Sequence, residues 1–207
     1  LSLHDALPIL VVIAHDSKSL TSQERVNNFI AEIQNNHPNM SVAGPYYMDQ
    51  IDDIKKTIAE QQLDIVPVEG QELDEEQQTA LDDAIAQITD EDIYNYILEM
   101  NPDVKGIFAT NGDTTMQALT ACEGKDMKDV VIMGYDADQE EIDAMKDGRI
   151  AGMIVQNPYG MGYATVVAEA RCVLNMGNEA NVNTGYTWVT PDNIEDRTVQ
   201  DILYAEK

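Results

Sequence analysis

Short apolar runs alternate with longer helical patterns along most of the chain, and this alternation constrains the fold more than any other feature. Strands separated by helical patterns of about ten residues or more indicate βαβ units and a mainly parallel sheet. The sequence therefore predicts an α/β fold, a Rossmann-like three-layer (αβα) arrangement around a parallel sheet. The expected strands are 10–14, 40–43, 106–109, 130–135, 151–155 and 186–189.

Capping residues and apolar side chains at helical spacing predict where the helices lie. Thr21 with Glu24 forms a capping-box pattern, Asp138 with Glu141 forms another, and Asp113 is interpreted as an N-cap. Residues 63–68 are interpreted as a short extended segment, and the helix that ends near residue 100 is expected to bury Ile93, Tyr96, Ile97 and Met100. The expected helices are 21–33, 51–58, 81–88, 89–100, 114–121, 139–146 and 159–176.

The charge of the chain limits the classes of partner that it can bind. Asp and Glu number 38 against 12 Lys and Arg, which gives a formal net charge of -26. Such a charge opposes approach to a phosphate backbone, so no nucleic-acid partner is expected. The sequence has no run of about 18 apolar residues, so direct membrane insertion of this segment is not expected either.

The cysteines and histidines do not predict a metal site. Cys122 and Cys172 lack the spacing of a zinc site, and His4, His15 and His37 are scattered along the chain. Both cysteines lie in helical patterns and are interpreted as small apolar core residues, with a disulfide between them as the alternative.

Polar residues follow four of the expected strands. Asp16, Asn111, Asp136 and Gln156 stand where these strands end, and ligands of open parallel sheets bind beyond the carboxyl ends of the strands. A carboxylate accepts two hydrogen bonds and an amide both donates and accepts, so this set suits a hydroxyl-rich ligand. Arg25, in the first turn of the first helix, is expected to point toward the same edge.

These residues also have a simpler interpretation. Polar residues are common where loops begin, and Asp16 is also a typical turn former. The sequence contains no G-x-S-x-G motif, no P-loop and no G-x-G-x-x-G motif after a strand, so neither an enzyme nor a cofactor is expected.

Four segments, in the same order along the chain, resemble sugar-binding proteins of ABC importers of the ribose and galactose type. Residues 101–111 are similar to their NPDVKGIFATN segment, and residues 131–136 to their V-V-G-(F/Y)-D strand. Residues 148–158 are similar to their G-x-(I/L)-x-A-(T/S)-(I/V)-x-Q-x-P crossover, and residues 22–29 to a helix start in which Asn28 replaces the usual glycine. The chain is thus identified as similar to the type 1 periplasmic binding proteins from about residue 10 onward.

The resemblance implies ligand roles for individual residues. Arg25, Asn111, Asp136 and Gln156 match the positions that would contact sugar hydroxyl groups. Further candidates, with looser matches, are Asp16, Tyr47, Met48 and Tyr135.

The resemblance also implies a division of the chain. Residues 10–156 would form the C-terminal sugar-binding lobe, with an acidic insertion at about 60–90, and residues 185–207 the final crossover strand and tail. Residues 157–184 would be a helix that belongs to an otherwise missing N-terminal lobe, and residues 1–9 are interpreted as a non-native extension. The apolar helix face from Val166 to Leu174 would then be exposed, which predicts self-association. One lobe alone is expected to bind sugar weakly or not at all.

The function implied by the resemblance is that of an extracytoplasmic solute-binding protein, often a lipoprotein. Its lobes would close on a sugar by hinge motion and deliver the sugar to the permease subunits of an ABC transporter. Two alternatives share this fold, the effector-binding domain of a lactose-repressor-type regulator and the sensor domain of a receptor kinase. The net charge of -26 argues against a DNA-bound partner.

Overall fold

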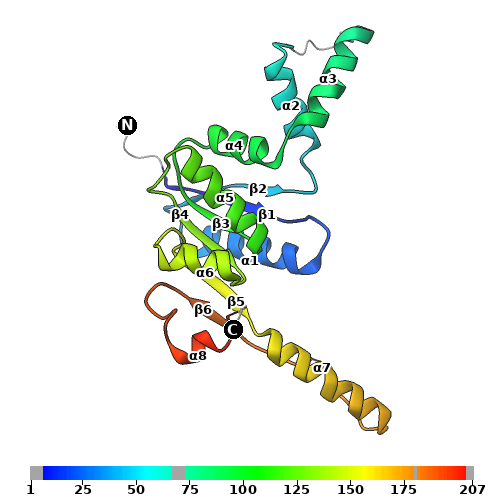
Figure 1. Ribbon diagram of the computed structural model, residues 1–207, viewed down its shortest axis with the longest axis vertical. Helices are drawn as coiled ribbons and strands as arrows, with labels where there is room; N and C mark the ends of the chain where they lie inside the picture. Colours follow the sequence, from blue (N-terminus) through cyan, green and yellow to red (C-terminus); the bar gives the residue numbers. More distant parts are fainter. Residues whose placement is uncertain (1–6, 67–72, 180, 204–207) are drawn as a thin grey trace.

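The structure, a computed structural model, describes residues 7–66, 73–179 and 181–203 of the chain. Six strands form one sheet in the order β2-β1-β3-β4-β5-β6, in which β6 alone is antiparallel to its neighbour (Figure 1). The predicted mainly parallel sheet is therefore confirmed. The strands are β1 Ile9–Ala14, β2 Ser41–Tyr47, β3 Val104–Ala109, β4 Val131–Tyr135, β5 Gly152–Gln156 and β6 Tyr186–Val189.

Helices follow the strands as the alternation predicted, and the short helix α8 is an addition that the sequence did not suggest. The cap at Asp138 with Glu141 is confirmed, and Thr89 caps α4, the helix expected from residue 89. The helices are α1 Leu20–Asn36, α2 Asp52–Gln62, α3 Glu75–Gln87, α4 Asp90–Met100, α5 Gly112–Gly124, α6 Gln139–Lys146, α7 Pro158–Val173 and α8 Arg197–Gln200.

The main core lies between one face of the sheet and helices α4, α5 and α6. Because parallel strands are covered by helices, their side chains on this face are almost fully excluded from water. The sheet contributes Val11, Ile13, Ile107, Ile132 and Met153. The helices contribute Ile93, Ile97, Leu119, Ile142 and Met145.

The opposite face of the sheet packs against α1. Val12 and Phe108 from the strands meet Val26 and Phe29 from α1, and the rings of Phe29 and Phe108 are stacked with centroids 4.3 Å apart. The predicted three-layer arrangement is thus confirmed. Beside α1, a groove of about 560 Å³ with a mainly apolar lining runs over β1, β3 and β4.

Two helix starts differ from the prediction. Helix α1 begins at Leu20, because Ser19 and not Thr21 is its N-cap and accepts a hydrogen bond from the Ser22 backbone N–H at 3.3 Å. Helix α5 is capped by Asn111, and Asp113 is already its second residue. In both cases the cap is the polar residue whose side chain reaches a free N–H group of the first helical turn.

Two further interpretations were wrong. Met100 of α4 is 58% exposed, whereas Tyr94 and Leu98 are buried in its place, since the buried face of α4 is rotated from the predicted one. No extended segment forms at residues 63–66, where α2 ends in a turn, and residues 67–68 of the expected segment lie outside the described residues. Helices α2 and α3 lie away from the sheet at one end of the molecule (Figure 1).

The cysteines have different environments. Both are free, so the disulfide alternative is not formed. Cys122 on α5 is buried, as predicted, and burial raises the pKa of its thiol to about 11. Cys172 is exposed, so its core interpretation was wrong, because it lies on helix α7, which no helix or strand among the described residues covers.

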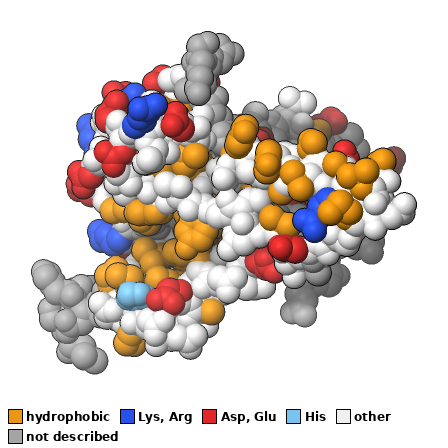
Figure 2. Space-filling view, turned by 90° about the horizontal axis from the view of Figure 1, so that it is seen from below, with side chains coloured by type: hydrophobic (Ala, Val, Ile, Leu, Met, Phe, Trp, Pro, Cys, Tyr) orange, Lys and Arg blue, Asp and Glu red, His pale blue; other side chains and the backbone are white. Residues whose placement is uncertain are grey.

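Helix α7 projects away from the body of the molecule (Figure 1), and none of its residues is buried. Its exposed apolar side chains recur at helical spacing and include Tyr159, Tyr163 and Val166. Figure 2 shows hydrophobic side chains gathered over this segment. Exposed apolar patches of this kind favour association in water.

Replacing Val166 and Val173 together by glutamine should abolish self-association of the 207-residue chain. Glutamine keeps a high helix propensity while it removes apolar surface, and the two valines are 64% and 81% exposed. In sedimentation velocity, the mass of the wild-type chain should rise with concentration, whereas the variant should stay near 23.0 kDa. The control, Thr165→Gln, lies about a quarter turn from both valines around α7 and should behave like the wild type. A wild-type chain that is monomeric at all concentrations would contradict the expectation.

Candidate functional site

Asp136, directly after β4, lies at the centre of the carboxyl edge of the sheet. Its Oδ2 atom accepts a hydrogen bond from the Gly112 backbone N–H at 3.3 Å, and its Oδ1 atom accepts one from Gln156 Nε2 at 3.4 Å. Its own backbone N–H donates to the Ile154 carbonyl at 3.1 Å. The edge therefore brings together Asp136 and Gln156, as the topology predicted.

The backbone of Asp136 is in the left-handed region, with φ 73°. Non-glycine residues are uncommon there, although Asp tolerates it better than most, and such positions concentrate at functional sites. The half-buried carboxylate is held by two long hydrogen bonds, both to neutral donors. A ligand hydroxyl group could replace either donor without leaving a charge unpaired.

Arg25 reaches the same edge from α1. Its Nη1 atom donates to the Thr110 carbonyl, and its guanidinium carbon lies 3.9 Å from the centroid of the Tyr135 ring, a cation–π contact. Burial raises the pKa of the Tyr135 hydroxyl group, so this group remains a neutral donor and acceptor. A hollow of about 470 Å³ beside this pair is lined by Arg25, Tyr135, Phe108 and Ile154 among others.

Asn111 caps helix α5 and also lies at the carboxyl edge of the sheet. Its Oδ1 atom accepts hydrogen bonds from the Thr114 backbone N–H at 3.1 Å and from Thr114 Oγ1 at 2.7 Å, which caps α5. Among the described residues its Nδ2 atom makes no hydrogen bond, so the amide presents a donor while its oxygen is engaged.

The carboxylate of Asp16 makes its hydrogen bonds within its own loop. Its carboxylate accepts hydrogen bonds from the backbone N–H groups of Lys18 and Ser19 and from Ser19 Oγ, and His15 Nε2 lies 3.1 Å from Oδ2. The backbone N–H of Ser19 is the main cause that lowers the pKa of Asp16. The turn-forming interpretation therefore describes what Asp16 does in this structure.

Tyr47 and Met48 lie apart from Asp136. Tyr47 ends β2, the edge strand, and Met48 follows it; β4 is separated from β2 by β1 and β3. At the usual spacing of neighbouring strands this is a distance of about 14 Å. Both side chains are half-buried against the core, so the structure does not bring them together with Asp136.

The sequence interpretation missed two residues. The Thr110 carbonyl holds Arg25, and Thr110 Oγ1 lies 2.9 Å from His15 Nδ1. The Gly112 N–H holds Asp136. Gly112 could have been recognised from the sequence, because it is the first residue of a helix that starts at the carboxyl edge, where backbone N–H groups point outward.

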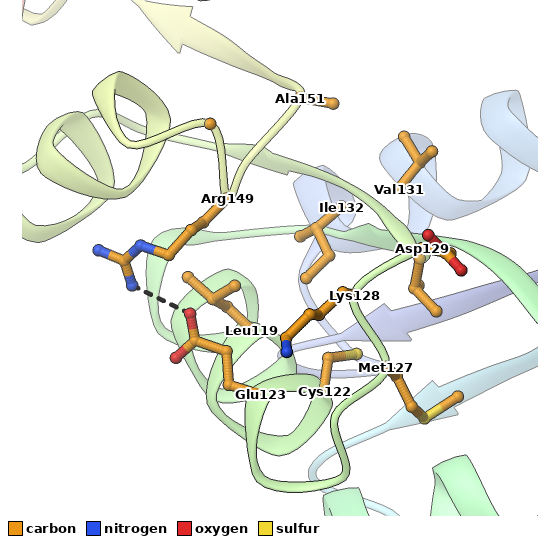
Figure 3. A pocket seen from close by; sticks show the side chains of 12 residues that line it. Leu119, Cys122, Glu123, Met127, Lys128, Asp129, Val131, Ile132, Arg149 and Ala151 are labelled. Atoms are coloured by element: carbon orange, nitrogen blue, oxygen red, sulfur yellow. Dashed lines mark hydrogen bonds and ion pairs between the residues drawn. The ribbon is translucent and has the colours of Figure 1, made fainter.

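A separate cavity of about 500 Å³ lies at the opposite edge, where β4 and β5 begin (Figure 3). Leu119, Cys122 and Ile132 form its apolar part, and Arg149 at its rim is already paired with Glu123 at 3.2 Å. Ligands of open α/β sheets bind at the carboxyl ends of the strands, so this cavity is not the candidate site.

The described part of the chain has neither a metal-binding cluster nor a membrane-spanning helix. No group of three or more His, Cys, Asp or Glu residues there is arranged to hold a metal ion. No helix in residues 7–66, 73–179 and 181–203 is long and apolar enough to cross a membrane.

The sequence has relatives among ribose-binding proteins. The ribose import binding protein of Salmonella typhimurium is 35% identical over 66 residues, which is 32% of this chain and 22% of that protein. The ribose import binding protein of Haemophilus influenzae is 31% identical over 86 residues, 42% of this chain and 29% of that protein. The alignments thus cover less than a third of either relative.

Solved structures share the fold over a longer stretch. A carbohydrate transporter solute binding protein from Agrobacterium radiobacter, in complex with D-arabinose, has a TM-score of 0.71 at 22% identity and covers 95% of this chain and 55% of its own. An ABC transporter solute binding protein from Agrobacterium vitis with bound D-fucose also has a TM-score of 0.71 at 22% identity, over 96% of this chain and 57% of its own. This chain therefore spans about half the length of these two proteins.

One family matches the chain directly, and it is described as the periplasmic binding protein domain. The match extends over residues 49–171, more than half of the chain, and includes Asn111, Asp136 and Gln156. The resemblance read from the four sequence motifs is confirmed: this chain belongs to the periplasmic binding protein family.

Proposed function

We propose that this chain is the sugar-binding part of an extracytoplasmic solute-binding protein that delivers its ligand to the permease subunits of an ABC transporter. The observation that carries the proposal is the placement of Asp136 at the carboxyl edge of the sheet, with Gln156 and Gly112 as exchangeable donors. A carboxylate and an amide side by side can bind two adjacent sugar hydroxyl groups.

The similarity to ribose import binding proteins supports a sugar as the ligand and an importer as the partner. It favours this function over a repressor effector domain or a receptor sensor domain. An acidic protein without a metal cluster among its described residues suits a neutral, hydroxyl-rich ligand. The protein acts by binding and release, not by catalysis.

The proposed division of the chain into lobes keeps all strands of the sheet in one lobe. Residues 10–156 together with β6 form one lobe, and the acidic helices α2 and α3 extend from it. In this proposal, helix α7 belongs to a second lobe, and a sugar lies between the two lobes when they close. The exposed apolar side chains of α7 support this assignment, because such a surface needs a partner.

A thermal-shift screen of the complete gene product against D-ribose, D-arabinose, D-fucose and a panel of other pentoses, hexoses and disaccharides tests the proposal. At least one sugar should raise the melting temperature in a dose-dependent manner, because a ligand that binds the folded state stabilises it. A flat response to every sugar would contradict the proposed ligand class.

Asp136→Ala in the same protein should weaken the affinity for the best sugar by about tenfold to a hundredfold. The reason is that a hydrogen bond to a charged group contributes about 1.5–3 kcal/mol. Isothermal titration calorimetry measures this change directly. Asp103→Ala removes the same side chain at an exposed position before β3, at the opposite edge, and should leave the affinity unchanged. A loss below about threefold in Asp136→Ala would contradict the role of Asp136.

A further inference from the structure

Glu141, the third residue of α6, carries a buried carboxyl group that the proposed binding chemistry does not use. Its exposed fraction is 0%, the lowest of any acidic residue that the structure describes. The Oε2 atom accepts a hydrogen bond from the Asp138 backbone N–H at 3.1 Å, as part of the capping box of α6. The Oε1 atom is buried and has no hydrogen-bond partner among the described residues.

The carboxyl group of Glu141 lies against Gly112. A Cβ atom added to Gly112 would stand 3.2 Å from Oε2 and 3.4 Å from Oε1 of Glu141. The backbone N–H of the same glycine donates to Asp136 Oδ2. Glu141 therefore supports, from inside the protein, the peptide group that holds Asp136 at the candidate site.

The charged groups that face Glu141 are all acidic. Asp138 precedes α6, Asp136 follows β4, and Asp113 lies in the first turn of α5. No ion pair with a basic residue involves Glu141 in the described part of the chain. Burial, with these three carboxylates as smaller contributions, raises the pKa of Glu141 to about 8, although the Asp138 N–H opposes the change.

We propose that Glu141 is a positioning residue of the sugar site: as a neutral acid it keeps the Gly112 N–H in place and leaves Asp136 as the one charged acceptor there. The inference rests on the proposed function for its ligand. Loss of the Glu141 proton would put a second negative charge beside Asp136 in a buried space. The carboxylate would then move toward water, and the first turn of α6 and the Gly112 peptide would move with it.

Nuclear magnetic resonance tests the positioning role without any sugar. In the labelled complete gene product, the Glu141 side-chain carboxyl carbon should titrate with a midpoint near pH 8, and the Gly112 amide should shift with the same midpoint. A midpoint near the ordinary glutamate value of 4.5, or a Gly112 amide that does not follow Glu141, would overturn the proposal.

The pH dependence of the sugar affinity tests whether protonation of Glu141 is coupled to sugar binding. With D-ribose or D-arabinose as the probe, whichever binds more tightly, the wild-type Kd should rise at least about fivefold between roughly pH 6.5 and 9.5. In Glu141→Gln, whose amide cannot lose a proton, the ratio of the Kd values at these two pH values should stay within about twofold. The control Glu140→Gln changes an exposed acid in the same helical turn and should keep the wild-type ratio.

Because proton binding and sugar binding are thermodynamically linked, the effect of sugar on the titration of Glu141 is a reciprocal measurement. If protonation of Glu141 favours binding fivefold, saturating sugar must raise the midpoint of the Glu141 titration by about 0.7 pH. Equal pH profiles for the wild type and Glu141→Gln would overturn the coupling. If neither sugar binds at about pH 6.5, the proposed function fails with these probes, and the Gly112 titration alone decides whether Glu141 positions this peptide.

Discussion

Replacing Gly134 by alanine should destabilise the folded protein by about 3 kcal/mol, because the new methyl group has no room. A Cβ atom on this β4 glycine would lie 2.2 Å from Thr115 Oγ1 and 2.5 Å from Thr115 Cγ2. Thr115 is fully buried, and its hydroxyl group donates to the Asn111 carbonyl at 2.7 Å, so it cannot simply turn away. Helix α5 would have to move off the sheet. Urea denaturation, followed by circular dichroism, measures the change in unfolding free energy.

Two further variants make this prediction specific. Gly124→Ala, at the other end of α5, places its methyl group where no atom lies within 4 Å, so stability should stay the same or rise by up to about 1 kcal/mol. Thr115→Ala combined with Gly134→Ala should recover part of the loss, because it removes Oγ1 and Cγ2 but leaves the Thr115 Cβ atom at 2.9 Å. If Gly134→Ala remains within about 0.5 kcal/mol of the wild type, the close contact between α5 and β4 is not real.

The second large effect concerns the pH dependence of stability. The folded-state pKa of Glu141 is about 8, above its ordinary value of 4.5, so the folded protein keeps a proton that the unfolded chain releases. The stabilising contribution of this proton is fully present below about pH 4.5. It declines as the pH rises and is lost once the pH passes about 8, because the unfolded state binds fewer protons over this range.

Glu141→Gln removes that dependence, since an amide does not titrate. The unfolding free energy of the variant minus that of the wild type should therefore grow by about 2–4 kcal/mol between about pH 5 and 9. Urea denaturation at one-unit pH intervals measures this difference and cancels the general repulsion of a chain with a net charge of -26. Glu140→Gln should give a difference that does not change with pH. A constant difference for Glu141→Gln as well would show that the buried carboxyl group titrates normally.

Much of the fold was predictable because its causes are local. Buried strands such as 106–109 need continuous apolar runs, and helices between them need an apolar stripe, so the order of elements can be read along the chain. Helix starts were less predictable where several capping residues compete. Ser19 and Thr21 lie two positions apart, and the choice of Ser19 depends on the turn that Asp16 forms after β1.

The candidate site was predictable in its position but not in its hydrogen bonds. Parallel topology places Asp136 and Gln156 at one edge, and this required no distances. The contact of Arg25 with Tyr135 and the support of Gly112 by Glu141 depend on tertiary packing between α1, α5, α6 and the sheet. Local patterns carry no such information, so these contacts follow from the structure alone.

The antiparallel pairing of β6 with β5 has a consequence for the connectivity of the chain. Gln156 and Tyr186 are paired across the two strands, so the chain leaves the sheet and returns to it at neighbouring positions. Residues 157–185, helix α7 included, are thus topologically one long loop of a β-hairpin. Opposite residues of antiparallel strands lie about 5 Å apart, a gap that a two-residue turn can close. A shorter continuous polypeptide, in which such a turn replaces residues 157–185, could therefore keep all six strands beside their present neighbours.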